Sequence, residues 1–188
     1  MASLRFGFGN RRAAILLGIL IGMGTGVEAQ TRAPARRIVA RVEEARRTVL
    51  PGNTHRLARQ ARLLSPAPAE LPMDRMLLVL RGSTEQEREL TSLLEDLHDP
   101  TSVYYHQWLS PDEFGRRFGP ADDDIRTVTS WLASRGFSVD NIAKGRTAIE
   151  FSGTAQQVEQ AFHTAIRRVS VNGEEHWANI TDPPFHPP

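Results

Sequence analysis

The residues of this sequence that could act chemically are its histidines, one Ser-Gly-Thr run and one run of aspartates, because it contains no cysteine. The histidines show neither an HExxH pattern nor another paired spacing typical of a metal site, and no Gly-rich phosphate-binding loop is present. They are His55, His98, His106, His163, His176 and His186. The sequence therefore predicts no metal, no nucleotide cofactor and no thiol chemistry.

Two short polar runs are better explained as helix starts than as active sites. Ser152-Gly153-Thr154 has no accompanying acid or base motif that would activate a serine, whereas Thr154 and Gln157 have the spacing of a capping box. The aspartates at 122–124 lack the spaced oxygen ligands and the distal glutamate of a calcium loop. Their charge suits the positive end of a helix that follows directly. No catalytic residue is predicted.

The first thirty residues have the pattern of a secretory signal peptide. Basic residues precede an apolar run at 13–21, and Val27-Glu28-Ala29 places small side chains where a signal peptidase reads them. The apolar run is shorter than the roughly 20 residues that span a bilayer. We therefore predict cleavage between Ala29 and Gln30, and a secreted, periplasmic or extracellular protein without stable membrane insertion. The alternative is an uncleaved membrane anchor.

Charge divides the rest of the chain into two parts. Residues 30–70 hold nine arginines against three acidic residues, whereas residues 71–188 hold eleven basic and eighteen acidic ones. A domain that binds nucleic acid normally has a basic surface. The acidic balance of residues 71–188 therefore argues against a nucleic-acid partner. Ser65-Pro66-Ala67-Pro68 has the composition of an extended linker. The predicted division is a signal peptide (1–29), an Arg- and Pro-rich flexible leader (30–72), one folded domain (73–182) and a Pro-rich tail (183–188).

Apolar periodicity and capping signals predict the elements of the folded domain. Strands are expected at 76–80, 137–142, 148–151, 165–171 and 174–178, with an Asn172-Gly173 hairpin turn between the last two. Capping boxes at Thr84–Glu87, Ser110–Glu113 and Thr154–Gln157 open three helices, and a fourth runs from the aspartates to a cap at Gly136. The resulting β-α-β-β-α-β frame predicts an α+β fold, a ferredoxin-like antiparallel sheet with helices packed on one face.

The aromatic run Tyr104-Tyr105-His106-Gln107-Trp108-Leu109 lies between two predicted helices. It is either a plug in the core or an exposed recognition loop. The residue types favour the core, because large aromatic side chains are highly buried on average.

The run from Tyr105 to Phe114, which reads YHQWLSPDEF and continues through Phe118-Gly119-Pro120, resembles the N-terminal activation domain of the sedolisin/kumamolisin-type serine-carboxyl peptidases. Further runs extend the similarity to about residues 50–182, among them 76–80, 136–137, 151–154, 158–162 and 172–174. The resemblance implies a propeptide that precedes a subtilisin-like catalytic domain, assists its folding and blocks its cleft until acid triggers autoproteolytic removal.

The resemblance also implies what this chain should not contain. The catalytic domain, with its Glu, Asp and Ser triad and its calcium site, would follow Thr181-Asp182-Pro183. Ala155 stands where the reactive serine of the family's nucleophile motif would be. We therefore expect a propeptide that is not itself a peptidase and whose partner is the catalytic domain. The alternative is a free-standing secreted ferredoxin-like module that binds proteins without a link to proteolysis.

The predicted contact with that partner consists of acidic and aromatic side chains. Protonating carboxylates near their reference pKa of about 4 would weaken such a contact in acid. The candidate residues are Trp108, Asp112, Glu113, Asp122, Asp123, Asp124, His176 and Trp177.

Overall fold

The computed structural model describes residues 34–38 and 48–185. The predicted signal peptide with its Ala29–Gln30 cleavage site lies outside these residues, as does His186. The helices are α1 (Arg56–Gln60), α2 (Thr84–His98), α3 (Pro111–Phe118), α4 (Asp122–Ser134) and α5 (Ala155–Phe162). The strands are β1 (Thr48–Val49), β2 (Arg62–Pro66), β3 (Pro72–Val79), β4 (Ser138–Ile142), β5 (Ala148–Thr154), β6 (Ile166–Val171), β7 (Glu174–Asn179) and β8 (Pro184–Phe185). Within the described ranges, no helix has the length and apolarity needed to cross a bilayer.

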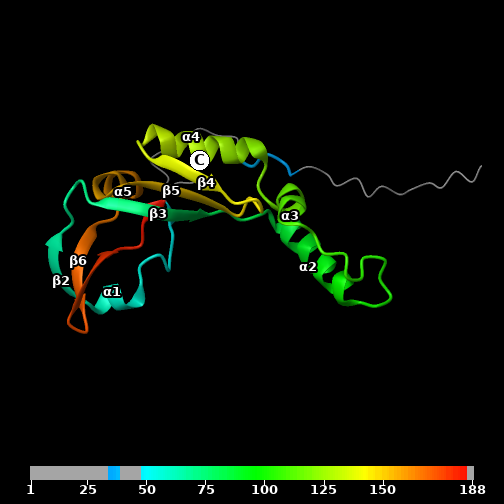
Figure 1. Ribbon diagram of the computed structural model, residues 1–188, viewed down its shortest axis with the longest axis horizontal. Coiled ribbons are helices and arrows are strands. Elements are labelled where there is room, and N and C mark those ends of the chain that lie inside the picture. Colours follow the sequence, from blue (N-terminus) through cyan, green and yellow to red (C-terminus); the bar gives the residue numbers. More distant parts are fainter. Residues whose placement is uncertain (1–33, 39–47, 186–188) are drawn as a thin grey trace, which may run out of the picture. The chain divides into compact units, whose positions relative to one another are not determined.

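Antiparallel pairing joins the strands into two three-stranded sheets, ordered β3-β5-β4 and β2-β6-β7, and a short β1-β8 pair (Figure 1). The α+β class and the antiparallel pairing are therefore confirmed. The predicted single sheet is divided in two, because β6 pairs with β2 rather than with β3. Pro66, Pro68 and Pro72 offer no N–H to a ladder, and a turn in which Leu71 N–H donates to the Pro68 carbonyl separates β2 from β3.

The stretch predicted to be a linker takes part in the second sheet. Pro66 lies opposite Arg167 on β6, and Ala67 N–H donates to the Ile166 carbonyl at 3.0 Å. Proline-rich backbone is already extended, so it can form an edge strand wherever its missing N–H groups face away from the partner. The linker interpretation of residues 65–68 was wrong for this reason.

Capping boxes set the starts of α2, α3 and α5. The capping boxes Ser110–Glu113 and Thr154–Gln157 are confirmed. The first box is Ser83–Gln86, one residue before the predicted pair. Gln86 also donates to the carbonyls of Arg117 and Gly119, and this tertiary contact fixes the frame. Gly136 follows α4 at a φ of +86°, a conformation that favours glycine, so the predicted cap is confirmed.

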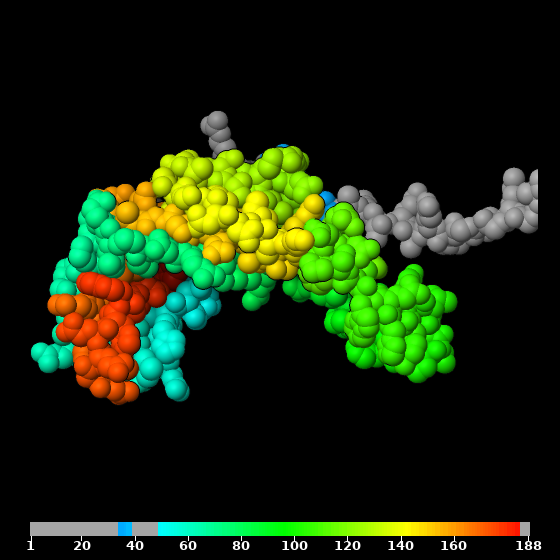
Figure 2. Space-filling view, in the orientation of Figure 1, coloured from blue at the N-terminus to red at the C-terminus, as the bar shows by residue number. Residues whose placement is uncertain are grey.

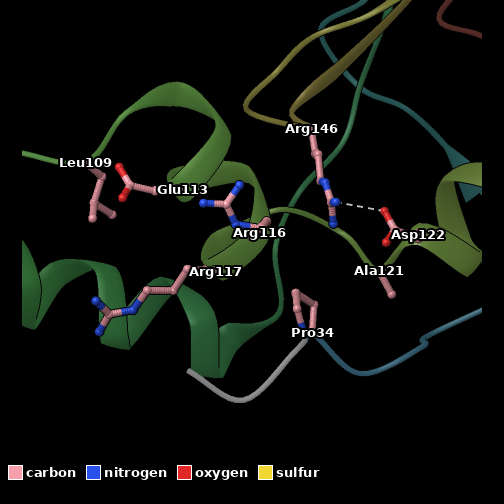
Figure 3. Close-up of a pocket in the computed structure, with 8 residues that line it drawn as sticks. All are labelled: Pro34, Leu109, Glu113, Arg116, Arg117, Ala121, Asp122 and Arg146. Carbon is pink, nitrogen blue, oxygen red and sulfur yellow. Dashed lines mark ion pairs between the residues drawn. The ribbon is translucent and has the colours of Figure 1, made fainter. Parts of the chain in front are cut away.

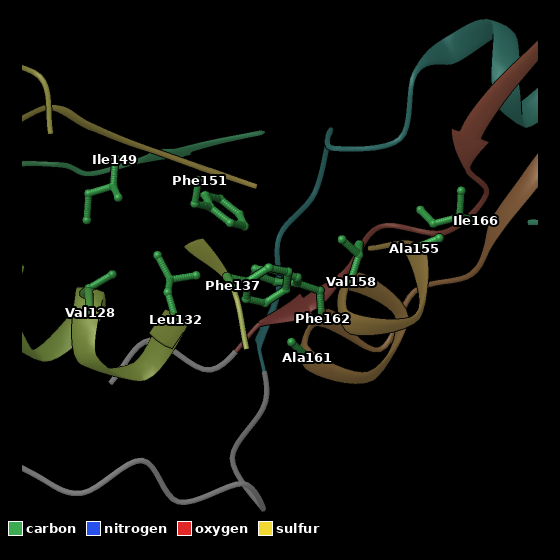
Figure 4. Close-up of a cluster of buried hydrophobic side chains, with 10 residues drawn as sticks. All are labelled: Val128, Leu132, Phe137, Ile149, Phe151, Ala155, Val158, Ala161, Phe162 and Ile166. Atoms are coloured by element: carbon green, nitrogen blue, oxygen red, sulfur yellow. The ribbon is translucent and has the colours of Figure 1, made fainter. Parts of the chain in front are cut away.

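The main core lies between the β3-β5-β4 sheet and the helices α4 and α5, which cover the same face of that sheet. Ile149 and Phe151 point from β5 toward α4 and the ring of Phe137 (Figure 4). Leu132 and Ile149 are completely buried. A second, small cluster of Leu93, Leu97 and Phe118 joins α2 to α3.

The two faces of this sheet should respond differently to truncation. Ile149→Ala removes fully buried methyl groups, and we expect it to lower the free energy of unfolding by about 2–5 kcal/mol. Leu77→Ala, on the opposite face of neighbouring β3, should cost less than about 1 kcal/mol because that side chain is exposed. Urea denaturation of both variants measures the two free energies of unfolding. An equal decrease in both variants would refute the assignment of the faces.

Candidate functional site

The face of the β3-β5-β4 sheet opposite the helices carries an exposed apolar pair. Leu77 and Val79 are 64% and 69% exposed, although Met76 and Leu78 between and beside them pack against the core. Alternate residues of a strand point to opposite faces, so Leu77 and Val79 lie side by side on the uncovered face. We call this surface the open sheet face.

Polar and charged groups border the open sheet face. Arg75 Nε lies 3.0 Å from the Glu150 carboxylate, and Glu150 is the residue directly opposite Leu77. The Ser152 hydroxyl donates to the Asp140 carboxylate and accepts the Arg75 N–H. Ser152 thus holds neighbouring strands together. An apolar centre with a polar border, as found on this face, is the usual composition of a protein interface.

Arg75 takes a backbone conformation that costs free energy. Its φ is +57°, and it lies at a register shift between Met73 and Met76 on β3. Such conformations persist in a non-glycine residue only where the surrounding contacts enforce them. Here the bulge directs the Arg75 guanidinium toward Glu150.

The aromatic run between α2 and α3 is exposed, so the core interpretation was wrong. Val103 and Trp108 are 79% and 61% exposed, and the loop lies at the surface in the green part of Figure 2. The Tyr105 ring stacks on His106 at 3.8 Å, and Trp108 meets His98 edge-on at 5.6 Å. The α2–α3 cluster is small, and of this run it takes in only Leu109.

A pocket of about 500 Å³ lies between α3 and the start of α4. Its wall combines three arginines with two carboxylates and three apolar or small residues (Figure 3). These are Arg116, Arg117, Arg146, Glu113, Asp122, Pro34, Leu109 and Ala121. Across the pocket, Arg146 Nη2 and Asp122 Oδ1 form an ion pair at 2.9 Å. We call this the arginine pocket.

The Glu113 carboxylate in this pocket already has hydrogen-bond donors within the chain. Its carboxylate accepts hydrogen bonds from the Ser110 hydroxyl and N–H at 2.6 and 2.8 Å. Hydrogen bonding by the Ser110 hydroxyl and then its N–H lowers the pKa of Glu113. Glu113 therefore stays ionised to lower pH than an ordinary glutamate.

Asp124 does not face a partner. It is only 4% exposed, and its carboxylate accepts the N–H groups of Arg37 and Ile38 at 3.0 and 2.9 Å. The Arg37 guanidinium also donates to the Arg81 carbonyl. Asp124 thus anchors a short leader segment, residues 34–38, to the start of α4, and its assignment to the partner interface was wrong.

The other predicted interface residues are exposed, but the structure does not gather them into one site. Glu113 and Asp122 share the arginine pocket, while Asp123 pairs with Arg126 on the surface of α4. His176 and Trp177 lie on β7, in the other sheet. Trp108 and Asp112 are exposed near the start of α3. Among the residues that the structure places, no group of three or more metal-ligating side chains is close enough to hold an ion.

A single carboxylate ties the end of the domain to its beginning. Asp182 accepts the N–H groups of Gly52 and Thr54 at 3.2 and 2.6 Å and pairs with Arg59 at 2.7 Å. Desolvation raises the pKa of Asp182, but the hydrogen bonds from Thr54, Gly52 and Arg59 outweigh it and lower the pKa to about 2. Leu50 N–H donates to the Pro183 carbonyl beside this contact.

The open sheet face was not predicted from the sequence, although a signal for it was present. The run 76–80 is apolar without interruption. In an antiparallel strand covered on one face only, alternate residues are expected to be polar, so an unbroken apolar run indicates a second apolar face. For Asp182 and Arg146 no local signal exists, because their partners are distant in sequence.

Fold and surface together define a small α+β domain with helices on one face of its β3-β5-β4 sheet and an exposed apolar pair on the other. Comparison with known proteins identifies it further: the chain belongs to the family described as Pro-kumamolisin, activation domain, whose profile matches residues 59–186. The predicted resemblance is thereby confirmed. The matched family is an activation domain, so residues 59–186 are not the catalytic part of a peptidase.

Relatives match this chain over part of their length. Xanthomonalisin from Xanthomonas sp. (strain T-22) is 34% identical over 90 residues, which are 48% of this chain and 11% of that protein. Sedolisin from Pseudomonas sp. (strain 101) is 26% identical over 102 residues, or 54% and 17% of the two chains. Aorsin from Aspergillus oryzae is 25% identical over 95 residues, or 50% and 15%. The chain therefore matches less than a fifth of each of these relatives.

Replacing Asp182 by asparagine should destabilise the domain in a pH-dependent way. Because the folded pKa is depressed from 3.8 to about 2, the stabilisation is complete above pH 4 and is lost as the pH falls toward 2. The melting temperatures of Asp182→Asn and the parent chain should differ at pH 7 and converge near pH 2. Asp112→Asn, at an exposed site, is the control and should differ little. A constant difference across this range would contradict the account.

Removing the Asp124 carboxylate should free the leader segment. Asp124→Ala leaves the N–H groups of Arg37 and Ile38 without their acceptor, so hydrogen exchange at both amides should become fast. We expect the free energy of unfolding to fall by about 1–3 kcal/mol, the range for hydrogen bonds to a charged group. Asp123→Ala, at the adjacent and exposed position in the same helix turn, is the matched control. Unchanged protection of these amides in Asp124→Ala would refute the anchoring role.

Proposed function

We propose that this chain is the propeptide of a secreted sedolisin-type peptidase and that it inhibits the subtilisin-like catalytic domain by docking its open sheet face on it. Membership in the activation-domain family supports the choice of partner. The observation that carries the proposal is the exposure of Leu77 and Val79 on the helix-free face of the β3-β5-β4 sheet.

The apolar pair is large enough to matter for affinity. Complete burial of a leucine or valine side chain contributes about 1.5–3 kcal/mol. Leu77 and Val79 already bury about a third of their surface, so their docking contributes on the order of 3 kcal/mol, or about 100-fold in the dissociation constant. The Arg75–Glu150 pair at the border sets the orientation more than the affinity.

The same docking accounts for a role in folding. A preformed sheet face offers the catalytic domain an apolar surface before its own packing is complete, and a ligand that binds only the folded form stabilises it by mass action. The domain has a core of its own, which includes Val128, Leu132 and Phe137.

Acid release follows from the carboxylates near the contact. A carboxylate that the complex holds in its ionised form contributes fully above its free pKa of about 4, and its contribution is lost as the pH falls below that value. Glu150 and Asp140 border the open sheet face and place two carboxylates beside the proposed contact. Asp182, with a pKa of about 2, stays ionised throughout and keeps the end of the domain in place.

Titrating the purified chain into an acid-active sedolisin-type peptidase between about pH 3 and 7 tests the proposal. We expect inhibition that is tight near neutral pH and weakens in acid. Absence of inhibition for every related peptidase would refute it and favour the free-standing secreted binding module.

A charged substitution on the open sheet face should abolish docking without unfolding the domain. In the double variant Leu77→Asp and Val79→Asp, two apolar contacts are lost and two charges would be buried, so the inhibition constant should rise at least about 100-fold. Leu63→Asp, an exposed leucine on β2 of the other sheet, is the matched control and should inhibit like the parent chain. Equal inhibition by both variants would exclude this face as the docking surface.

A further inference from the structure

The arginine pocket is built with features that its packing alone does not require. Its three guanidinium groups come from two separate segments, because Arg116 and Arg117 lie on α3 while Arg146 lies in the turn between β4 and β5. Figure 3 shows Arg146 reaching across to Asp122 and Arg116 turned toward Glu113. The volume of about 500 Å³ falls within the range of about 300–1,000 Å³ that ligand pockets occupy.

Arg146 is held in place at a conformational cost. Its φ is +58°, in the left-handed region that side-chain-bearing residues rarely adopt. Two glycines of the facing segment allow the close approach: a Cβ at Gly115 would lie 2.3 Å from the Lys144 carbonyl oxygen, and one at Gly119 would lie 2.7 Å from the Arg146 Cβ. Strained residues that their surroundings enforce in this way cluster at functional sites.

The carboxylates of the arginine pocket do not form ion pairs with all of its guanidinium groups. Arg117 pairs with Glu89 outside the pocket wall, and Asp122 engages one nitrogen of Arg146. Glu113 accepts its short hydrogen bonds from Ser110. Arg116, on the exposed side of α3, forms no direct ion pair with any residue in the described ranges, although, after the Ser110 hydrogen bonds, its charge also helps to lower the pKa of the nearby Glu113 carboxyl. Its guanidinium, and the remaining N–H groups of Arg146, are therefore available to a ligand.

We infer that the arginine pocket binds a carboxylate side chain on an extended peptide segment, and that this segment belongs to the catalytic domain; the second part rests on the proposed function. Planar guanidinium groups bind carboxylates in a bidentate manner. A single carboxylate suits the site better than a phosphate, because Glu113 and Asp122 would repel a dianion. Leu109, Pro34 and Ala121 supply an apolar wall for the neighbouring residues of the peptide.

Binding of a small probe to the purified chain tests the pocket independently of any peptidase. The probe is the blocked tripeptide acetyl-Leu-Glu-Leu-amide, with its Gln counterpart as the uncharged control, titrated by NMR near neutral pH. We expect the Glu peptide to bind at least about tenfold more tightly than the Gln peptide, since each factor of ten corresponds to one charge-assisted contact of about 1.4 kcal/mol. Equal binding of the two peptides, or tighter binding of inorganic phosphate, would overturn the inference.

Matched variants assign the effect to the pocket. Arg116→Gln and Arg146→Asn should each weaken binding of the Glu peptide about tenfold. Asparagine tolerates the left-handed conformation at position 146, so the fold should be retained, which the melting temperature checks. Arg126→Gln, an exposed arginine on nearby α4, is the control and should bind like the parent chain. Unchanged binding in Arg116→Gln would exclude the pocket.

The same variants separate this inference from the proposed function. If the parent chain inhibits a sedolisin-type peptidase and Arg116→Gln inhibits at least about tenfold less well, both stand. If Arg116→Gln inhibits like the parent chain, the peptidase segment is not the ligand while the proposed function remains. If the parent chain inhibits no peptidase, the proposed function fails, and the assignment of the segment to a catalytic domain fails with it.

Discussion

A strand that is apolar on both faces, in a sheet covered on only one, is the constraint on which this structure depends. Met76 and Leu78 face the core with Ile149 and Phe151, and this packing under α4 and α5 fixes the position of β3. Alternation along the strand then forces Leu77 and Val79 to the opposite face. Exposed apolar patches bordered by polar residues are typical of sites of protein association. The apolar pair on which the proposed docking depends is therefore a consequence of the packing of the core.

Single carboxylates attach the peripheral segments to this core. Asp124 holds residues 34–38 through their backbone N–H groups, and Asp182 holds the segment around Thr54. A carboxylate that accepts several N–H groups is worth more than a neutral acceptor, because each bond is charge-assisted. The depressed pKa of Asp182, about 2, keeps this attachment intact at acidities that titrate ordinary carboxylates. The proposed acid release would therefore leave the segment around Thr54 attached to the domain.

Local signals in the sequence predicted the helix starts and the hairpin, because a capping hydroxyl or an Asn-Gly turn acts over three or four residues. The pairing of β6 with β2 could not be predicted in this way, since the prolines that separate β2 from β3 resemble a linker until a distant partner strand is known. Trp108 is exposed because the cluster between α2 and α3 is small and does not take in its side chain. Among three consecutive aspartates, only the helix rotation of about 100° per residue decides that Asp124 faces inward.

Hydroxyl-radical footprinting of the chain with and without a sedolisin-type peptidase reads the solvent exposure of individual side chains and so tests docking through the open sheet face. We expect Leu77 and Val79 to lose most of their labelling in the complex, while Leu63 and Trp177 on the other sheet keep theirs. Protection of the β6–β7 hairpin with Leu77 and Val79 still labelled would contradict docking through the open sheet face.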